Sequence, residues 1–337
     1  MTVSVVIATY NRASMVRQAI QSALAQTWPA EEIVVLDDGS TDATWETLTE
    51  LASEYPRLRV FRRASNSQGV AAWNDAAAQA RGDYIAFCAD DDRFLPEHLE
   101  ASVAYLDAHP QTGLVHSGFI DVVEGSGERP GSESVKQRPP RSKEPLAVTR
   151  ANLIPYMTRY YDWPLHPSTL VLRRAVWVRS GGYNPAYALA DTDWFVRTVE
   201  QVPAVLLPRE GVYNRRHSGN WSNRLGSARM QAEIFQIVDA SIARVFEGCT
   251  PGKRVRRILW RAVWRADVRL HLLLTAWARL QTGHEAAACA AWHGILRNTG
   301  GPAAPRWLFR AGTDLIRWHC RGREPENANQ HERYSPL

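Results

Sequence analysis

The chain has 337 residues, 45% of them hydrophobic, so it can bury one large core or two ordinary ones. Its four cysteines are widely spaced and form no CxxC pair, which argues against a zinc site or a disulfide framework and fits a reduced compartment. The N-terminus has no basic segment followed by a long apolar one, and no run of 18 apolar residues occurs. We therefore expect neither a signal peptide nor a membrane span.

The net charge of +5 is unevenly distributed along the chain. Residues 252–323 hold 14 Lys and Arg against 3 Asp and Glu, so this segment is strongly basic while the rest of the chain is acidic. A basic segment of this kind is either a solvated face or a surface for an anionic partner, such as lipid, nucleic acid or an acidic protein.

Strands and helices are predicted to alternate through the first 110 residues. The β-rich runs are 3–10, 32–40, 58–63 and 84–89. The segments with helical spacing or helix-capping signals are 12–26, 40–55, 69–80 and 95–110. This alternation predicts an α/β fold with βαβ units and a Rossmann-like, mostly parallel sheet, in which ligands bind at the carboxyl ends of the strands.

Beyond residue 110 the pattern becomes less regular. We expect a strand at 113–123, a loop or poorly ordered insertion after it up to residue 145, and a strand, helix and glycine turn over 168–185. A helix at 190–202 and a strand with a basic loop over 204–222 follow, and from about residue 230 the pattern is helical. The predicted division is a catalytic domain over 1–225 and a helical, basic C-terminal region over 226–337.

Acidic residues cluster where the predicted strands end. Asp37 and Asp38 follow the second strand, and Asp90, Asp91 and Asp92 follow the fourth. Adjacent carboxylates raise one another's pKa, so we expect a positive group to relieve the repulsion within the triplet. Such oxygens can accept hydrogen bonds from a base or ribose, or bind a hard divalent cation that stabilises a leaving diphosphate. The plainer alternatives are turn chemistry for the pair and helix capping for the triplet.

Six ordered segments resemble family 2 glycosyltransferases of the GT-A fold: VSVVIATYNR, VVLDDGSTDAT, ASNSQGVAAWNDAAAQARGDYIAF, ADDDRFLP, GGYNP and ADTDWFVR. The resemblance covers roughly residues 3–222. It implies a GT-A nucleotide-diphospho-sugar transferase fold and an inverting transfer from a nucleotide-diphosphate sugar, most commonly UDP-linked. The implied acceptor is a hydroxyl of a saccharide, a lipid-linked compound or another molecule, in surface polysaccharide or glycan synthesis.

The same resemblance implies a role for each residue of the donor site. Asp38 is expected to contact the nucleobase, and Asp91 is expected to be the principal residue for a Mg²⁺ or Mn²⁺ cofactor. The other residues implied to contact the nucleotide, its diphosphate or the metal are Ala8, Thr9, Tyr10, Asp37, Asn74, Asp90 and Asp92.

Asp191 takes the position of the general base, which removes the proton from the acceptor hydroxyl as that hydroxyl attacks the anomeric carbon. The basic loop that follows residue 212 is expected to neutralise the leaving diphosphate through His217, Arg215 and Arg216. Asp191 could instead be a simple helix cap. We expect Asp193 to be a structural acid and Arg197 to pair with a neighbouring acid.

Three positions depart from the family pattern. Ala89 and Ala190 stand where the family usually carries an acid, so the metal site depends on the three aspartates that follow Ala89. Trp73 stands before Asn74 where the family often has Arg, so a nucleotide contact is either lost or replaced by stacking. We expect His166 to be a core or loop histidine rather than part of the acceptor pocket.

The C-terminal region contains an arginine every four residues from Arg257 to Arg269, accompanied by tryptophans and leucines. This pattern suits either a helical subdomain packed on the catalytic domain or a helix lying in a membrane interface. We expect a cytoplasmic protein that needs no nucleic acid, with peripheral contact to the inner face of the membrane as the alternative location.

Two other enzyme classes fit the sequence less well than a transferase does. A phosphatase that uses an Asp nucleophile needs Asp-x-Asp-Gly-Thr, whereas this chain reads Asp37-Asp38-Gly39-Ser40-Thr41. A dehydrogenase is disfavoured because no G-x-G-x-x-G follows the first strand. A non-catalytic protein that binds a nucleotide sugar or acts as a scaffold on the same fold remains the alternative.

Overall fold

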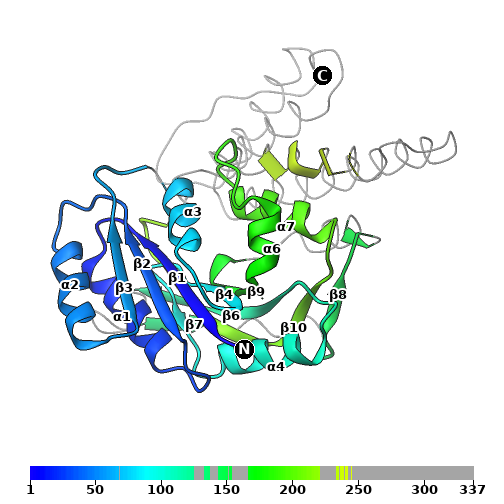
Figure 1. Cartoon of the computed structure of the whole chain (residues 1–337), viewed down its shortest axis with the longest axis horizontal. Helices are drawn as coiled ribbons and strands as arrows, with labels where there is room; N and C mark the ends of the chain where they lie inside the picture. The colour runs from blue at the N-terminus through cyan, green and yellow to red at the C-terminus, as the bar shows by residue number, and fades with distance from the viewer. Residues whose placement is uncertain are drawn as a thin grey trace, which may run out of the picture.

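The computed structural model describes residues 1–67, 69–124, 133–136, 143–150, 152–153 and 166–220, and scattered residues between 233 and 244. In this part of the chain, ten strands form one sheet with helices on both faces (Figure 1). The strand order is β3-β2-β1-β4-β9-β6-β10-β5, with β7 beside β6 and β8 beside β10. Strands β1, β2, β3, β4, β6 and β10 run in one direction, so the sheet is mixed and mostly parallel, as predicted.

The strands are β1 (Val3–Thr9), β2 (Glu32–Asp37), β3 (Leu58–Arg62), β4 (Tyr84–Phe87), β5 (Arg93–Phe94), β6 (Leu114–Glu124), β7 (Glu133–Lys136), β8 (Leu146–Val148), β9 (Leu170–Arg173) and β10 (Ala204–Arg216). The helices are α1 (Ala13–Leu24), α2 (Thr44–Glu54), α3 (Val70–Ala78), α4 (His98–Ala108), α6 (Arg174–Ser180) and α7 (Ala190–Val199), with a 3₁₀ turn η1 (Pro167–Thr169).

The sheet is buried on both faces, as expected when helices cover both sides of parallel strands. In β1, Val5 and Ile7 join a core formed with α1, α2 and α4, whereas Val6 joins a core formed with α3, α6 and α7. This alternation follows from the two-residue period of a strand. The helices therefore fix the position of the strand ends from above and below the sheet.

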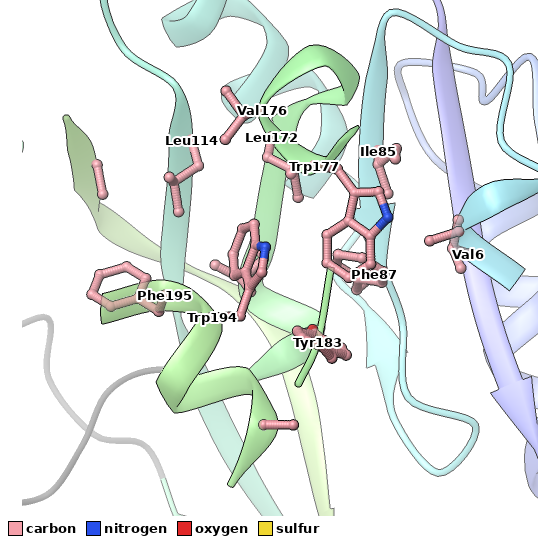
Figure 2. Close-up of a cluster of buried hydrophobic side chains, with 14 of the residues drawn as sticks. Val6, Ile85, Phe87, Leu114, Leu172, Val176, Trp177, Tyr183, Trp194 and Phe195 are labelled. Carbon is pink, nitrogen blue, oxygen red and sulfur yellow. The ribbon is translucent and has the colours of Figure 1, made fainter. Parts of the chain in front are cut away.

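An aromatic cluster attaches α6 and α7 to β4 (Figure 2). The ring of Trp177 in α6 lies 4.9 Å from that of Phe87 in β4 and 5.4 Å from that of Trp194 in α7, measured between centroids. Tyr183, which follows α6, packs edge-on against Trp177 at 5.0 Å. Large aromatic surfaces dominate core energetics, so this cluster holds the start of α7 at a fixed place relative to the sheet.

Two local predictions were wrong. The predicted loop after β6 contains strand β7, which pairs antiparallel with β6 at the sheet edge. The predicted basic loop begins later than expected, because β10 continues through Arg215 and Arg216 and pairs with Val122 and Val123 of β6. In both cases a neighbouring strand completes the backbone hydrogen bonds of a polar segment, and local composition carries no signal for that pairing.

The predicted C-terminal helical region lies almost entirely outside the described residues, as does the predicted boundary at residue 225. Among the residues that the structure describes, no helix combines the length and apolar character needed to cross a membrane.

One buried histidine lies in the core beside β5 and β10. His98, the first residue of α4, is 2% exposed, and neither of its ring nitrogens has a hydrogen-bond partner among the described residues. A Cβ at Gly211 of β10 would lie 2.2 Å from its Nδ1, so the backbone of β10 passes directly over the ring. Burial, assisted by the charge of Arg209, lowers the pKa of His98 to about 3, and the ring is therefore neutral in the folded protein.

Candidate active site

The carboxyl ends of β1, β2 and β4 meet at one edge of the sheet. Thr9 is paired with Asp37 in the β1–β2 ladder, and the backbone N–H of Asp38 donates to the Thr9 carbonyl at 2.8 Å. On the other side of β1, the N–H of Cys88 donates to the Val6 carbonyl at 3.0 Å, which brings the end of β4 next to β1. The residues predicted at the three strand ends therefore share one edge, with Ala8 next to the last residue of β1 and Tyr10 just beyond the strand.

Asp37 and Asp38 are buried and held in place by neighbouring groups. Asp37 accepts a hydrogen bond from the Ser40 N–H at 3.0 Å, and its other oxygen lies 3.1 Å from Arg62 Nε. Both oxygens of Asp38 accept from the N–H and the hydroxyl of Ser67, at distances of 2.9 and 3.0 Å. A carboxylate has about four lone-pair sites, so these contacts orient both groups while leaving acceptor capacity.

The positive group that relieves the aspartate triplet is Arg12. Its Nη1 donates to Asp90 Oδ1 at 2.8 Å and to Asp91 Oδ2 at 2.5 Å, and its Nη2 donates to the Gly219 carbonyl at 3.2 Å. Arg12 comes three residues after β1 and directly before α1. This role of Arg12 was not predicted from the sequence, although a basic residue just beyond a strand end that shares an edge with the triplet was the available signal.

Asp91 connects the triplet to the loop that follows β10. Its Oδ2 also lies 3.1 Å from His217 Nε2 and accepts from Asn220 Nδ2 at 3.2 Å. Burial by itself raises the pKa of Asp91, but the contact with His217 and the charge of Arg12 outweigh it and lower the pKa to about 2. Asp91 is therefore ionised at neutral pH.

Asp90 and Asp92 are less well compensated. Burial raises the pKa of each to about 6, and the charge of Asp91 adds to the effect. Arg12 opposes this rise at Asp90, and His166 opposes it at Asp92. Asp92 also accepts from the Ser168 hydroxyl at 2.5 Å. Arg12 thus pairs with two of the three carboxylates, Asp90 and Asp91, and among the described residues the cationic partner of Asp92 is His166. An excess of negative charge therefore remains.

His166 lies between the triplet and the predicted base. Its Nδ1 is 3.3 Å from Asp92 Oδ2, and its charge in the protonated form acts on Asp91 and Asp191 as well. Asp191, the second residue of α7, accepts from the N–H of Thr192 at 2.8 Å, and burial raises its pKa. A carboxylate with a raised pKa is suited to taking up a proton. His166 thus contacts the aspartate triplet, a contact that the sequence did not indicate.

Asn74 bonds to the backbone of Tyr183. Its Nδ2 donates to the Tyr183 carbonyl at 2.8 Å, and the Tyr183 N–H donates to its Oδ1 at 2.9 Å. Its predicted contact with the nucleotide is untested, and the neighbouring Trp73 packs edge-on against Phe87 at 5.6 Å between ring centroids. The hydroxyl of Tyr183 is buried and has no hydrogen-bond partner among the described residues.

The turn before Tyr183 is bound to α7 by Arg197. Gly182 has a φ of 70°, and a Cβ there would lie 2.7 Å from Asn74 Oδ1, so glycine is required on two counts. Arg197 donates through Nη2 to the Gly182 carbonyl and through Nε to Asp193, at 2.9 and 2.8 Å. Asp193 and Arg197 form the structural pair that was predicted. Helix α3, the glycine turn and α7 are thus joined by polar contacts as well as by aromatic packing.

The two predicted loop arginines lie in strand β10, and their side chains bond to α1 and to β6. Arg215 donates through Nη2 to Gln18 Oε1 at 2.5 Å, and its backbone N–H donates to Asp92 at 3.2 Å. Arg216 donates through Nε to Asp121 at 2.8 Å. Of the basic residues predicted after residue 212, His217 is the one whose side chain contacts the triplet.

Comparison with known proteins shows the family of this domain. Residues 4–161 match the model of Glycosyl transferase family 2. These residues are part of a family 2 glycosyltransferase domain. An uncharacterised glycosyltransferase of Nostoc sp. is 34% identical to it over 148 residues, which are 44% of each protein. An uncharacterised glycosyltransferase of Rickettsia felis is 25% identical over 233 residues, or 69% of this chain and 37% of that protein. The chain therefore spans less than half the length of these relatives.

Solved structures share the fold of the glycosyltransferase domain. The Staphylococcus aureus TarS fragment 1–349, solved with UDP-GlcNAc, has a TM-score of 0.63 at 17% identity, covering 96% of this chain and 91% of that one. The mannosyltransferase PcManGT of Pyrobaculum calidifontis, solved with GDP-Man and Mn²⁺, has a TM-score of 0.52 at 17% identity, covering 94% and 84%. The predicted GT-A fold is confirmed.

Proposed function

We propose that the protein is an inverting glycosyltransferase that moves a sugar from a nucleotide-diphosphate donor to an acceptor hydroxyl. The observation that carries the proposal is that Asp91 and Asp92 follow β4 at the carboxyl edge of the sheet in a family 2 domain, where His166 lies 3.3 Å from Asp92 and its charge also acts on Asp91 and Asp191. Ligands bind at this edge in open α/β sheets. UDP-GlcNAc in TarS and GDP-Man in PcManGT support a nucleotide-sugar donor.

On this proposal the nucleoside lies over the ends of β1 and β2. Asp38 accepts hydrogen bonds from the base, while Asp37 and the strand tip of Ala8, Thr9 and Tyr10 complete the nucleoside site. The fixed orientation of both carboxylates by Ser40 and Ser67 supports this assignment, because a pre-ordered acceptor loses little freedom on binding.

The aspartate triplet suits a divalent cation that the donor itself helps to hold. Among the described residues, no group of three or more His, Cys, Asp and Glu side chains is arranged to bind a metal. Mg²⁺ and Mn²⁺ nevertheless need only one or two carboxylates when substrate phosphates complete the shell. Asp91 and Asp92 would hold the cation, Asp90 and His217 would flank it and the diphosphate, and the uncompensated negative charge supports this fit. Such a cation supplies Lewis-acid stabilisation of the leaving diphosphate.

The transfer itself is a single displacement at the anomeric carbon. The acceptor oxygen forms the new glycosidic bond from one face as the bond to the diphosphate oxygen breaks on the other, which inverts the configuration. Asp191 removes the acceptor proton, and the nucleoside diphosphate leaves with the electron pair. The raised pKa of Asp191, caused by burial, brings its basicity closer to what proton transfer at neutral pH requires.

The test is equilibrium binding of UDP-, GDP- and dTDP-sugars with Mn²⁺, Mg²⁺ or EDTA, followed by NMR of the anomeric product. The wild type should bind one donor class in a metal-dependent way, and D91N should lose that binding. D83N is the matched control. Asp83 lies just before β4, at the opposite end of the strand from Asp91, and it accepts a hydrogen bond from the Thr2 N–H instead of facing the triplet. Donor binding without transfer to any acceptor would favour a scaffold, and the absence of any donor binding would reject the proposal.

A further inference from the structure

One oxygen of Asp91, the residue proposed to hold the cation, is already crowded. Arg12, His217 and Asn220 all contact the same atom, Oδ2, at 2.5, 3.1 and 3.2 Å. A carboxylate oxygen offers about two lone-pair sites, so this atom is saturated. A cation that binds Oδ2 must therefore displace one of the three groups.

Arg12 is the group whose charge conflicts with a cation. A guanidinium stays protonated at every relevant pH, so Arg12 cannot make room by losing a proton, as a lysine or histidine could. Its 2.5 Å contact with Asp91 places a full positive charge where a divalent cation would bind. Coulomb repulsion between them is strong at this range in a partly buried site, because screening by water is reduced.

A nucleoside diphosphate removes the conflict. It brings negative charge that neutralises the cation, and its oxygens offer Arg12 the bidentate partner that a guanidinium prefers. The Arg12 side chain is 21% exposed and lies at the start of α1, so it borders solvent rather than the closed core. Its Nη2 bond to the Gly219 carbonyl also connects any movement of Arg12 to the loop that carries His217.

We propose that Arg12 makes divalent-cation binding at Asp91 conditional on a nucleoside diphosphate. In the free protein Arg12 occupies the carboxylate and keeps the cation out, and with the diphosphate present Arg12 pairs with phosphate and yields Asp91 to the cation. This inference rests on the proposed function, in which Asp91 binds the cation, and it adds the order in which the partners can bind.

The test is titration of the full-length protein with MnCl₂ alone, free Mn²⁺ being measured by electron paramagnetic resonance. R12Q should bind Mn²⁺ at least tenfold more tightly than the wild type. The double variant R12Q/D91N should lose that gain. The matched control is R17Q, which removes the same charge from the next turn of α1, where Arg17 pairs with Glu50 on the surface. R17Q should bind Mn²⁺ as the wild type does.

The same titration with saturating UDP or GDP separates the two proposals. In the wild type the nucleotide should raise the Mn²⁺ affinity at least tenfold, and in R12Q the increase should be much smaller. One outcome refutes the role of Arg12 and leaves the proposed function standing. In that outcome the wild type binds Mn²⁺ when nucleotide is present, but without nucleotide R12Q binds Mn²⁺ no more tightly than the wild type does. If neither nucleotide promotes Mn²⁺ binding to the wild type, the proposed metal site itself is refuted. The wild-type measurement keeps the inference testable even if R12Q does not fold.

Discussion

Replacing His98 by leucine should remove a large part of the acid sensitivity of the fold. His98 is buried and its ring nitrogens have no partner among the described residues, so the folded protein holds it neutral with a pKa of about 3. In the unfolded chain the ring titrates near the ordinary histidine pKa of about 6.5. Below that pH the unfolded state binds one more proton than the folded state, so the free energy of unfolding falls as the pH falls.

The size of this effect follows from the two pKa values. Between pH 7.5 and pH 5, the extra proton of the unfolded chain costs the folded state about 2 kcal/mol. The loss continues until the pH reaches the folded pKa near 3. H98L has no proton to bind at this position, and it also removes two unsatisfied polar atoms from the core, so it should resist acid better than the wild type.

The assay is urea unfolding at pH 7.5, 6 and 5, with the free energy obtained by linear extrapolation. The difference between H98L and the wild type should change by about 2 kcal/mol from pH 7.5 to pH 5. Other titrating groups, such as the aspartate triplet, occur in both proteins and cancel in this difference. H109Q, which removes the histidine at the other end of α4, is measured beside it as the control for the loss of a histidine from the same helix. A difference that stays constant with pH would refute the reasoning.

Three further variants test the neighbourhood of the proposed base. Y183F should raise the free energy of unfolding by about 1 kcal/mol, because it deletes a buried hydroxyl that has no partner among the described residues, and a fall measured by urea unfolding would show that the hydroxyl is bonded. D191N should lower kcat by roughly 100-fold or more while the donor Kd stays nearly constant, whereas an unchanged kcat would remove Asp191 from the role of base. N74A should lose about 2 kcal/mol of stability, because two hydrogen bonds to Tyr183 disappear, and weaker nucleotide binding at unchanged stability would instead support the contact predicted from the sequence.

The sequence predicted the framework of the site well, because that framework depends on short-range patterns. Alternating strands and helices were enough to bring Asp37, Asp38 and the aspartate triplet to one sheet edge, as the β1–β2 register confirms. Three adjacent aspartates also predicted that a positively charged group lies next to them. That partner was not predictable from the triplet itself, because Arg12 is 78 residues from Asp90 and meets it only through the parallel pairing of β1 with β4.

The residues that surround the site were harder to predict for the same physical reason. His166 is a single histidine in an irregular segment, and only the folded chain shows that it lies beside Asp92. Strand β7 is polar and short, and its place depends on the edge that β6 provides. Arg216 was predicted to lie in a loop, but in the structure it belongs to β10, where it pairs with β6 and donates to Asp121. Long-range pairing overrides local propensity in each case.

The contacts around Gly182 limit which amino-acid substitutions the protein can accept at the neighbouring positions. Asn74, Gly182 and Arg197 come from three separate stretches of the chain, yet both other residues contact Gly182: the amide of Asn74 fills the space that a side chain at residue 182 would need, and Arg197 donates to the carbonyl of the same glycine. A change at one of the three therefore alters which residues are acceptable at the others. A pairwise mutational scan should find strong epistasis among these positions, and a chimera that exchanges α7 for that of another glycosyltransferase should fold only when the partners in α3 and the glycine turn are exchanged with it.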